Sequence, residues 1–321
     1  MEGKADLKRL KSSVFSIFLL PIIILVVTPY GIFPSSAASA RASAGTLSFE
    51  EKMSLYSLRQ EGWEINSRQI LQRLSSFHGE VGLVVKDLKT GWTFLHNDEA
   101  LFPAASLIKI PIMVACFKAF QEGLLDLNEK YVLKRKDRVS GSGILRRMRN
   151  GGAFTYEELI NYMVTHSDNI ATNVLIEKLG FDYINGVFRE LGLKETVLNR
   201  KMIDFTAREN GLENYTSASE MAELLEDIYS GRALTPEISE RCLKILKEQK
   251  INDRLPRYLP REAVVAHKTG LEREVCHDAG IVFSPHGDYV IAILVRTWSG
   301  PLTAKNFIAR LSSYFYQVFK S

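Results

Sequence analysis

The chain is predicted to adopt an α+β fold, because segments with strand character stand near both ends of the sequence and helical segments fill the middle. Two extended apolar runs, 81–86 and 92–95, flank a turn near the N-terminal end, and two further strands are expected at 275–283 and 289–295. Strands separated by a long helical region predict one antiparallel sheet beside an all-helical region. Residues 48–321 contain no internal repeat and no linker.

The composition is that of an ordinary globular protein. The 321 residues are 46% hydrophobic and 24% charged, which suits one large domain or two modest ones. The formal net charge is +4, and residues 1–44 contribute +3 of it (five basic residues against two acidic ones), so the rest of the chain carries about +1. Nucleic acid is therefore not an expected partner.

Residues 1–44 are expected to be a targeting segment. Four basic residues precede the apolar core 14–27, and small-residue A-x-A sites follow at 38–40 and 42–44. This pattern predicts a signal peptide cleaved after Ala40 or Ala44, with an uncleaved membrane anchor as the alternative. Either interpretation places the main part of the chain, residues 45–321, outside the cytoplasm as a secreted, periplasmic or cell-surface protein. Contact with a membrane is expected only through this segment.

Local signals give the helices of the remaining chain. Helices are expected at 48–74, 107–122, 170–179 and 304–319. Ser106 stands where a serine N-cap is favoured, and Pro111 is tolerated only near a first turn. Thr155 and Glu158 form a capping box at the start of another helix.

Three short motifs with chemical potential follow one another. They are S-x-x-K at 106–109, S-D-N at 167–169 and K-T-G at 268–270. A second K-T-G, at 89–91, lies between the two apolar runs and is predicted to be a hairpin turn. S-x-x-K alone is weak evidence, but the ordered set of three is specific.

In this order and spacing the motifs resemble class A β-lactamases and penicillin-binding proteins, from about residue 48 to the C-terminus. The resemblance implies a two-lobed fold with a five-stranded antiparallel sheet flanked by helices. Its discontinuous α/β lobe would span about 45–105 and 235–321, and its helical lobe about 106–234. The active site would lie in the cleft between them, in a protein expected to be a monomer.

The residue types suit acyl transfer through a serine. Ser106 is the expected nucleophile, and Lys109, one helical turn further on, is its expected base. A cation at Lys268 would lower the pKa of Lys109, so that part of it is neutral. Ser167 would pass the proton to the leaving nitrogen, and Asn169 would hold the substrate's side-chain amide.

The resemblance adds the groups that bind substrate. It implies an oxyanion hole made by the backbone N–H groups of Ser106 and Leu271. Lys268, Thr269 and Gly270 would bind the carboxylate shared by penicillins and peptidoglycan stem peptides. No metal and no organic cofactor are expected, and the six histidines show no paired ligand spacing.

Each motif also has a purely structural interpretation. Ser106 can be only an N-cap, with Lys109 a solvated helix residue. The S-D-N motif can cap the helix that follows it, and K-T-G can be the end of a strand. The functional interpretation is favoured because all three motifs would otherwise have to be structural together.

The sequence departs from the class A pattern at the residue that clears the acyl-enzyme. Class A enzymes carry a glutamate there, in a pattern similar to R-x-E-x-x-L-N. Glu195 begins a literal E-x-x-L-N, but it follows S-D-N too closely. Aligning 196–200 with the family's T-x-L-x-R puts Met202 in the glutamate's place, and methionine cannot deprotonate water. Glu195 and Asp204 remain alternative carboxylates.

The expected activity is β-lactam hydrolysis, with deacylation slowed if no carboxylate replaces the glutamate. The alternatives are a D,D-carboxypeptidase or penicillin-binding protein acting on peptidoglycan stem peptides, and a binding protein that does not turn over. Serine glutaminases, which share S-x-x-K, are a more distant option.

Two other features are open to more than one interpretation. Seven basic residues surround 140–143, and they are expected to be either a solvated surface or a site of attraction to anionic cell-wall polymer or lipid headgroups. Of the three cysteines, Cys116 is expected to be buried, and a bridge between Cys242 and Cys276 is possible.

Overall fold

The computed structural model describes residues 47–320. The predicted leader, residues 1–44, lies outside these residues, and its cleavage or anchoring stays a prediction. Within 47–320, the helices are all too short or too polar to cross a bilayer.

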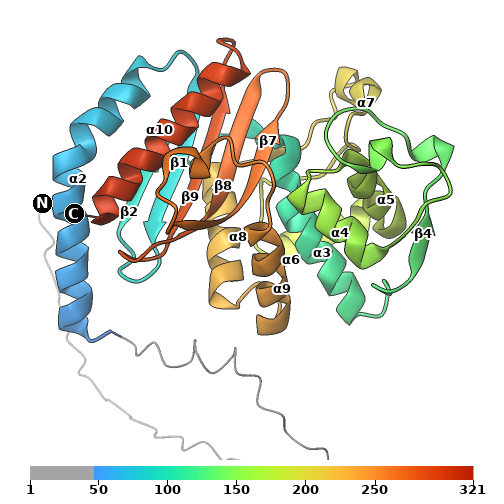
Figure 1. Ribbon diagram of the computed structural model, residues 1–321, viewed down its shortest axis with the longest axis horizontal. Coiled ribbons are helices and arrows are strands. Elements are labelled where there is room, and N and C mark those ends of the chain that lie inside the picture. Colours follow the sequence, from blue (N-terminus) through green and yellow to red (C-terminus); the bar gives the residue numbers. More distant parts are fainter. Residues whose placement is uncertain (1–46, 321) are drawn as a thin grey trace, which may run out of the picture. The chain divides into compact units, whose positions relative to one another are not determined.

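Five antiparallel strands form the main sheet, in the order β2-β1-β9-β8-β7 (Figure 1). The hairpin of β1 (Glu80–Asp87) and β2 (Thr93–His96) comes from the N-terminal part of the chain. The other strands, β7 (Val264–Leu271), β8 (Val275–Phe283) and β9 (Tyr289–Arg296), come from the C-terminal part. Because β1 pairs with β9 along its whole length, the two ends of the sequence meet inside one sheet. The predicted antiparallel sheet is confirmed.

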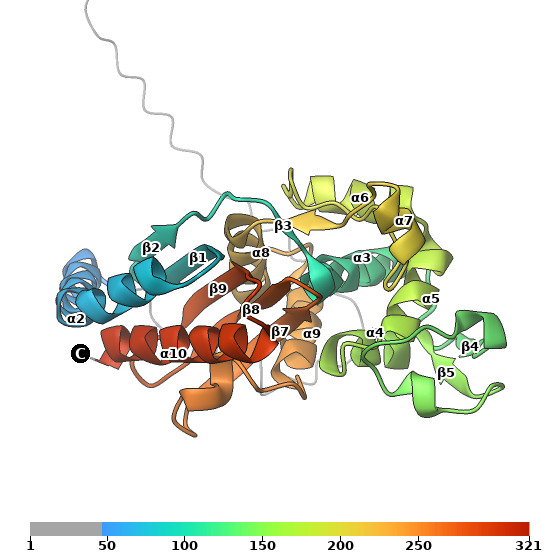
Figure 2. The ribbon, with the colours of Figure 1, turned by 90° about the horizontal axis from the view of Figure 1, so that it is seen from above.

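Successive side chains along each strand point to opposite faces of the sheet, and both faces are apolar. On β9, Ile293 belongs to the cluster that includes the helices at the chain ends, whereas Ala292 belongs to the cluster shared with the middle helices. The covering helices are α2 (Phe49–Ser76) and α10 (Pro301–Lys320) on one face, and α8 (Ala218–Ser230) and α9 (Pro236–Lys247) on the other (Figure 2). The sheet is therefore buried on both sides.

The helical lobe surrounds one buried helix, α3 (Lys109–Gln121). Almost every residue of α3 is buried, which explains why this helix is apolar on all sides. Its neighbours are α4 (Tyr156–Thr165), α5 (Asn169–Leu179) and α6 (Phe181–Glu190). Short elements complete the fold: β3 (Phe102–Pro103) with β6 (Tyr215–Thr216), β4 (Lys130–Val132) with β5 (Ala153–Thr155), α7 (Phe205–Glu209), and the 3₁₀ turns η1 (Ala105–Ile108), η2 (Arg135–Asp137), η3 (Leu145–Arg147) and η4 (Leu255–Tyr258).

Several local predictions are confirmed. Thr155 and Glu158 form the capping box at the start of α4. The first K-T-G copy makes the turn between β1 and β2, where Asp87 Oδ1 accepts hydrogen bonds from Lys89 N and Thr90 N at 2.8 and 3.2 Å. The lobe boundaries stay a prediction. Helix α8 falls within the predicted range of the helical lobe, about 106–234, but it packs on β1, β8 and β9 of the sheet.

The predicted N-cap at Ser106 is wrong. The α-helix begins at Lys109, and Ser106 lies inside the preceding turn η1, which has no side-chain cap. The reason is the backbone of Ala105, whose φ of +45° is in the left-handed region. This residue bends the chain into the turn before Ser106 is reached, so the serine hydroxyl is not used as a cap.

The cysteines are all free and buried within the described part of the chain. The expectation for Cys116 is confirmed, and Cys242 and Cys276 do not form a bridge.

Candidate active site

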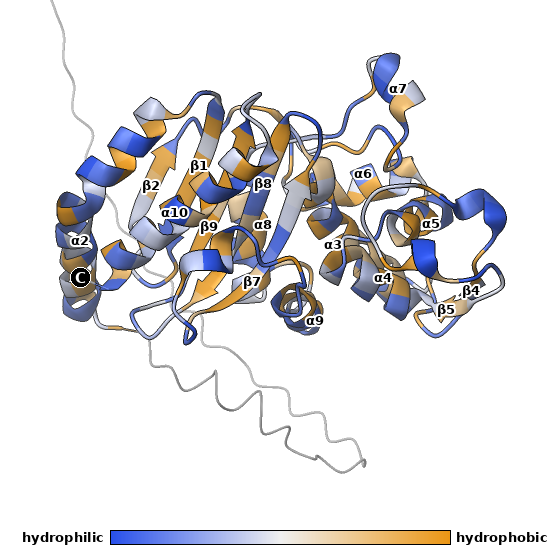
Figure 3. Cartoon of the chain, turned by 45° about the horizontal axis from the view of Figure 1, so that its top comes forward, coloured by the Kyte–Doolittle hydropathy of each residue, from blue (hydrophilic) through white to orange (hydrophobic). Residues whose placement is uncertain are grey.

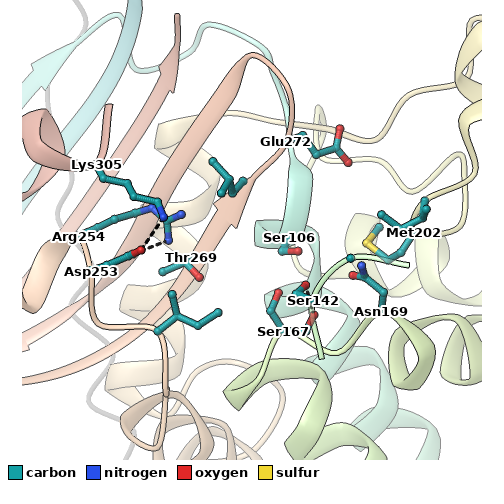
Figure 4. Close-up of a pocket in the computed structure, with 14 residues that line it drawn as sticks. Ser106, Ser142, Ser167, Asn169, Met202, Asp253, Arg254, Thr269, Glu272 and Lys305 are labelled. Carbon is teal, nitrogen blue, oxygen red and sulfur yellow. Dashed lines mark hydrogen bonds and ion pairs between the residues drawn. The ribbon is translucent and has the colours of Figure 1, made fainter. Parts of the chain in front are cut away.

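The three motifs meet at a cavity of about 380 Å³ between β7 and the helical lobe. Ser106, Ser167, Asn169 and Thr269 line it, together with Leu271. Figure 4 shows the two serines and Asn169 on the helical side, with Thr269 across from them on the sheet. Segments far apart in sequence thus present three hydroxyls and an amide to one space.

Ser106 is held at this cavity by the segment before it. His277 Nε2 lies 2.8 Å from Pro103 O, and burial lowers the pKa of His277 to about 4, so the ring is neutral and donates from this nitrogen. Gly270 permits the close approach of β7, because a Cβ there would lie 3.1 Å from His277 and 3.4 Å from Ala104 O. Within 47–320 the Ser106 hydroxyl forms no hydrogen bond, and the Lys109 amine is bonded to Ser167 and Asn169 instead.

The S-D-N motif combines a structural and a chemical part. Asp168 caps α5, since its Oδ1 accepts hydrogen bonds from Ile170 N and the next backbone N–H at 2.9 and 3.0 Å, and its Oδ2 accepts one from Leu145 N at 2.8 Å. Ser167 has a φ of +53°, an uncommon conformation for serine. The structural interpretation therefore holds for Asp168, while Ser167 and Asn169 turn toward the cavity.

Lys109 is fully buried and lies behind these side chains. Its Nζ donates to Ser167 O at 2.8 Å, Ser167 Oγ at 3.2 Å and Asn169 Oδ1 at 2.9 Å. Burial lowers the pKa of Lys109 to about 7, against the opposing attraction of Asp168 and Glu272. The interpretation of Lys109 as a solvated helix residue is thereby excluded. Near neutral pH its amine can accept a proton.

Lys268 approaches Ser167 from the sheet side. Its Nζ donates to Ser167 Oγ at 3.0 Å and to Thr269 O at 2.7 Å. Burial, with repulsion from Lys109 and Arg254, lowers the pKa of Lys268 well below its usual value. The lowered pKa of Lys109 was expected to come from the charge of Lys268, but its cause is burial. One hydroxyl thus links both amines.

Cationic side chains that were not predicted from the sequence line one side of the cavity. Arg254 is buried, its Nε donates to Cys276 Sγ at 3.2 Å, and its Nη1 lies 3.2 Å from Asp253 Oδ1 without a hydrogen bond. Lys305 Nζ lies 2.7 Å from the other oxygen of Asp253 (Figure 4). These groups line the cavity beside Thr269 and can attract a substrate carboxylate. They belong to no short motif, so only the fold reveals them.

Met202 lies at the cavity, where the alignment expects the glutamate. Its side chain is 4% exposed, and its backbone is bonded to the Asn173 side-chain amide at 2.7 and 3.0 Å. The two alternative carboxylates lie elsewhere. Glu195 lines a separate hollow beside Glu220, and Asp204 caps α7 by accepting a hydrogen bond from a backbone N–H at 3.0 Å.

Two other carboxylates line the cavity, Asp253 and Glu272, and neither was predicted from the sequence to be a site residue. Glu272 accepts hydrogen bonds from Arg200 Nη2 at 3.0 and 3.1 Å, and from Arg208 Nη1 at 3.4 Å. Arg200 also donates to Glu213 Oε1 at 2.8 Å. Guanidinium donors thus occupy both oxygens of Glu272, which leaves it poorly placed to take a proton from water.

Comparison with known proteins identifies the family. A family model described as "Beta-lactamase enzyme family" matches residues 66–319. The chain belongs to this family. It is 27% identical to a β-lactamase of Rhodobacter capsulatus over 223 residues, covering 68% of this chain and 75% of that one. It is 25% identical to β-lactamase VEB-1 of Pseudomonas aeruginosa over 236 residues, covering 68% and 77%.

Solved structures agree with this assignment. A β-lactamase of Sphaerobacter thermophilus is 30% identical, with a TM-score of 0.74 over 80% of this chain and 97% of that one. PBP-A is 34% identical, with a TM-score of 0.73 over 79% and 96%. A leucine-to-glutamate variant of PBP-A, in an acyl-enzyme complex with penicillin G, is 33% identical with a TM-score of 0.71 over 82% and 96%. The protein is a serine β-lactamase-like hydrolase with the two-lobed α+β fold of this family.

The contact of Asp168 with Gly143 gives a test of how the S-D-N motif is held. Gly143 has a φ of +122°, and a Cβ there would lie 2.3 Å from Asp168 Oδ2. We expect Gly143→Ala to lower the free energy of unfolding by about 3 kcal/mol or more and to slow acylation, because Asp168 must move. Urea denaturation and the rate of penicillin labelling measure the two effects.

Gly151→Ala is the matched control. Gly151 has a φ of +86°, but a Cβ added there would meet nothing within 4 Å, so only backbone strain of about 1 kcal/mol is expected. Equal losses in the two variants would show that the contact with Asp168 does not matter.

Proposed function

We propose that the protein forms an acyl-enzyme at Ser106 with β-lactams and releases it slowly. The observation that carries this proposal is that Ser106, Ser167, Asn169 and Thr269 line the same cavity as Met202, which stands where a deacylating glutamate is expected. β-Lactam hydrolysis is the activity of the family as a whole, so the proposal concerns the rate of its second step.

Acylation uses groups that the cavity brings together. Neutral Lys109 takes the proton of the Ser106 hydroxyl, and the oxygen attacks the lactam carbonyl. The backbone N–H groups of Ser106 and Leu271 bind the oxyanion. When the C–N bond breaks, Ser167 Oγ gives its proton to the leaving nitrogen and is reprotonated by Lys109 or Lys268, both within hydrogen-bond distance of it. The C–O ester bond to Ser106 remains.

Substrate is held on both sides of Ser106. Asn169 binds the side-chain amide, and Thr269, Gly270 and Lys268 form the carboxylate site. Arg254 extends this site with a buried guanidinium. A carboxylate beside the broken bond is common to penicillins and to stem peptides, so the same site serves both.

Deacylation lacks a base in the expected place. A water must lose a proton before it attacks the ester, and a positioned base contributes about 10²–10⁴-fold to such a step. Met202 cannot supply this, and Glu195 and Asp204 do not line the cavity. Of the two carboxylates that line it, Glu272 is bound by two arginines, and Asp253 lies against Lys305 and Arg254. The ester is therefore expected to last.

A peptidoglycan stem peptide is the second candidate substrate, as for a D,D-carboxypeptidase or penicillin-binding protein. A hollow of about 640 Å³ shares Ile203, Leu271 and Glu272 with the active-site cavity, which leaves room for an acyl donor longer than a β-lactam. Similarity to PBP-A at 34% identity supports the same choice. Residues 1–44 carry the predicted export segment, which would bring the enzyme to such a substrate.

The first test is the lifetime of the penicillin adduct. We expect intact-protein mass spectrometry to show one penicillin bound per chain, persisting for hours because the base is missing. Ser106→Ala should show no adduct. An adduct that disappears within seconds would contradict slow deacylation, and unchanged antibiotic without any adduct would contradict the acylation site.

Restoring a carboxylate tests the assignment of Met202. Met202→Glu should speed deacylation by about a hundredfold or more, because the new carboxylate can activate water. Met202→Gln has nearly the same shape without basicity, so its adduct should remain as long-lived as that of the natural protein. If both variants release penicillin at the same rate, a change of packing rather than a base is responsible.

The pKa of Lys109 predicts how acylation depends on pH. The amine must be neutral to take the proton of Ser106, and its pKa is lowered to about 7. The acylation rate should therefore rise about tenfold per pH unit below that value and level off above it. Stopped-flow measurement with a chromogenic cephalosporin checks this, and Lys109→Ala should lose both the rate and the pH dependence. A flat profile from pH 5 to 9 in the natural protein would exclude Lys109 as the base.

A further inference from the structure

The outer end of the helical lobe carries an unusual concentration of positive charge. We call it the basic tip, and it consists of the exposed residues Lys130, Lys134, Arg135, Arg146, Arg147 and Arg149. Within 47–320 no acidic side chain forms an ion pair with any of the six. Figure 3 shows hydrophilic ribbon around β4 and β5 at this end of the lobe.

The backbone brings the two halves of the basic tip together. Strands β4 and β5 pair, and two hydrogen bonds of 2.8 Å join Leu133, which follows β4, to residues 151 and 152, which precede β5. Arg138 connects the first half of the tip to residues 145–150, since it donates to Leu145 O and Met148 O at 2.7 Å and to the Asn150 side chain at 2.8 Å. Arg138 is thus a structural residue, and it fixes the turn that displays Arg146, Arg147 and Arg149.

The charge of the basic tip is opposite to that of the rest of the molecule. Residues 130–149 contain eight basic residues and one acidic residue, Asp137, a net charge of +7. The whole chain has +4, so all other residues together carry −3. An anionic partner is therefore attracted to this end of the lobe.

The basic tip adjoins the active site through one loop. Residues 140–143 connect its two halves and form the rim of the cavity, where Gly141 and Ser142 line the wall. Ser142 Oγ donates to Ser167 O at 2.7 Å, and Asn169 Nδ2 donates to Ser140 O at 3.2 Å. A polymer bound at the tip would thus lie next to the cavity that holds Ser106.

We propose that the basic tip is a docking surface for peptidoglycan, whose stem peptides carry repeated carboxylates. Four of the six side chains are guanidinium groups, which bind carboxylates through two parallel hydrogen bonds. A membrane would also attract these cations, but it would place headgroups, rather than an acyl donor, beside the rim. The choice of this polymer rests on the proposed function, because the polymer that carries the substrate gains most from docking there.

The test is sedimentation of the protein with purified peptidoglycan freed of other polymers. The variant Arg146→Glu, Arg147→Glu, Arg149→Glu should bind about tenfold less than the natural protein, and about 0.5 M salt should release the natural protein. The matched control reverses three exposed charges far from the tip, in Lys52→Glu, Arg68→Glu, Lys89→Glu (α2 and the β1–β2 turn, Figure 1), and should bind normally.

Penicillin labelling separates this proposal from the proposed function. Both triple variants should be acylated at the natural rate, which also shows that they are folded. If the tip variant with three glutamates does not fold, the same three arginines are replaced by glutamine instead. Equal binding of tip and control variants to peptidoglycan would overturn the proposal. So would binding of the natural protein only to phosphatidylglycerol vesicles, whereas loss of labelling in the natural protein would contradict only the acyl-enzyme.

Discussion

The buried ammonium of Lys109 is the interaction on which the active site depends. It joins α3 to the turn before α5 through Ser167 and Asn169, and it does so where water cannot reach. A buried cation is costly unless its hydrogen bonds are satisfied, so the turn must present three oxygens to it. The positive φ of Ser167 and the capping of α5 by Asp168 provide that arrangement. The same burial that makes Lys109 reactive therefore requires the rest of the motif.

The sequence predicted correctly those features that depend on neighbouring residues or on short motifs. The strands, the hairpin turn at 89–91 and the capping box at Thr155 depend on neighbouring residues, and they were found where expected. The left-handed backbone at Ala105 was missed because alanine gives no signal for it. Arg254 and Glu272 were missed because they reach the cavity only through tertiary contacts, and a single arginine or glutamate outside a motif has many possible places.

The loop that carries Met202 is held by ion pairs and by side-chain contacts to its backbone. Arg200 is held by Glu213 and by Glu272 of the strand end, and these ion pairs connect the loop with β7. Asn173 fixes the backbone on both sides of the Met202 residue. These contacts hold the backbone at residue 202 in place whatever its side chain contributes to the reaction.

The three buried thiols report separately on the two packed regions of the protein. Cys116 and Cys242 lie in the apolar cluster that joins the helical lobe to one face of the sheet, and Cys276 lies in the cluster between the other face and the helices at the chain ends. Burial raises the pKa of each thiol, which disfavours the reactive thiolate in the folded protein. An alkylating reagent can reach them only when the surrounding region opens. Peptide mapping of the alkylated residues would therefore show which region unfolds first, without any added label.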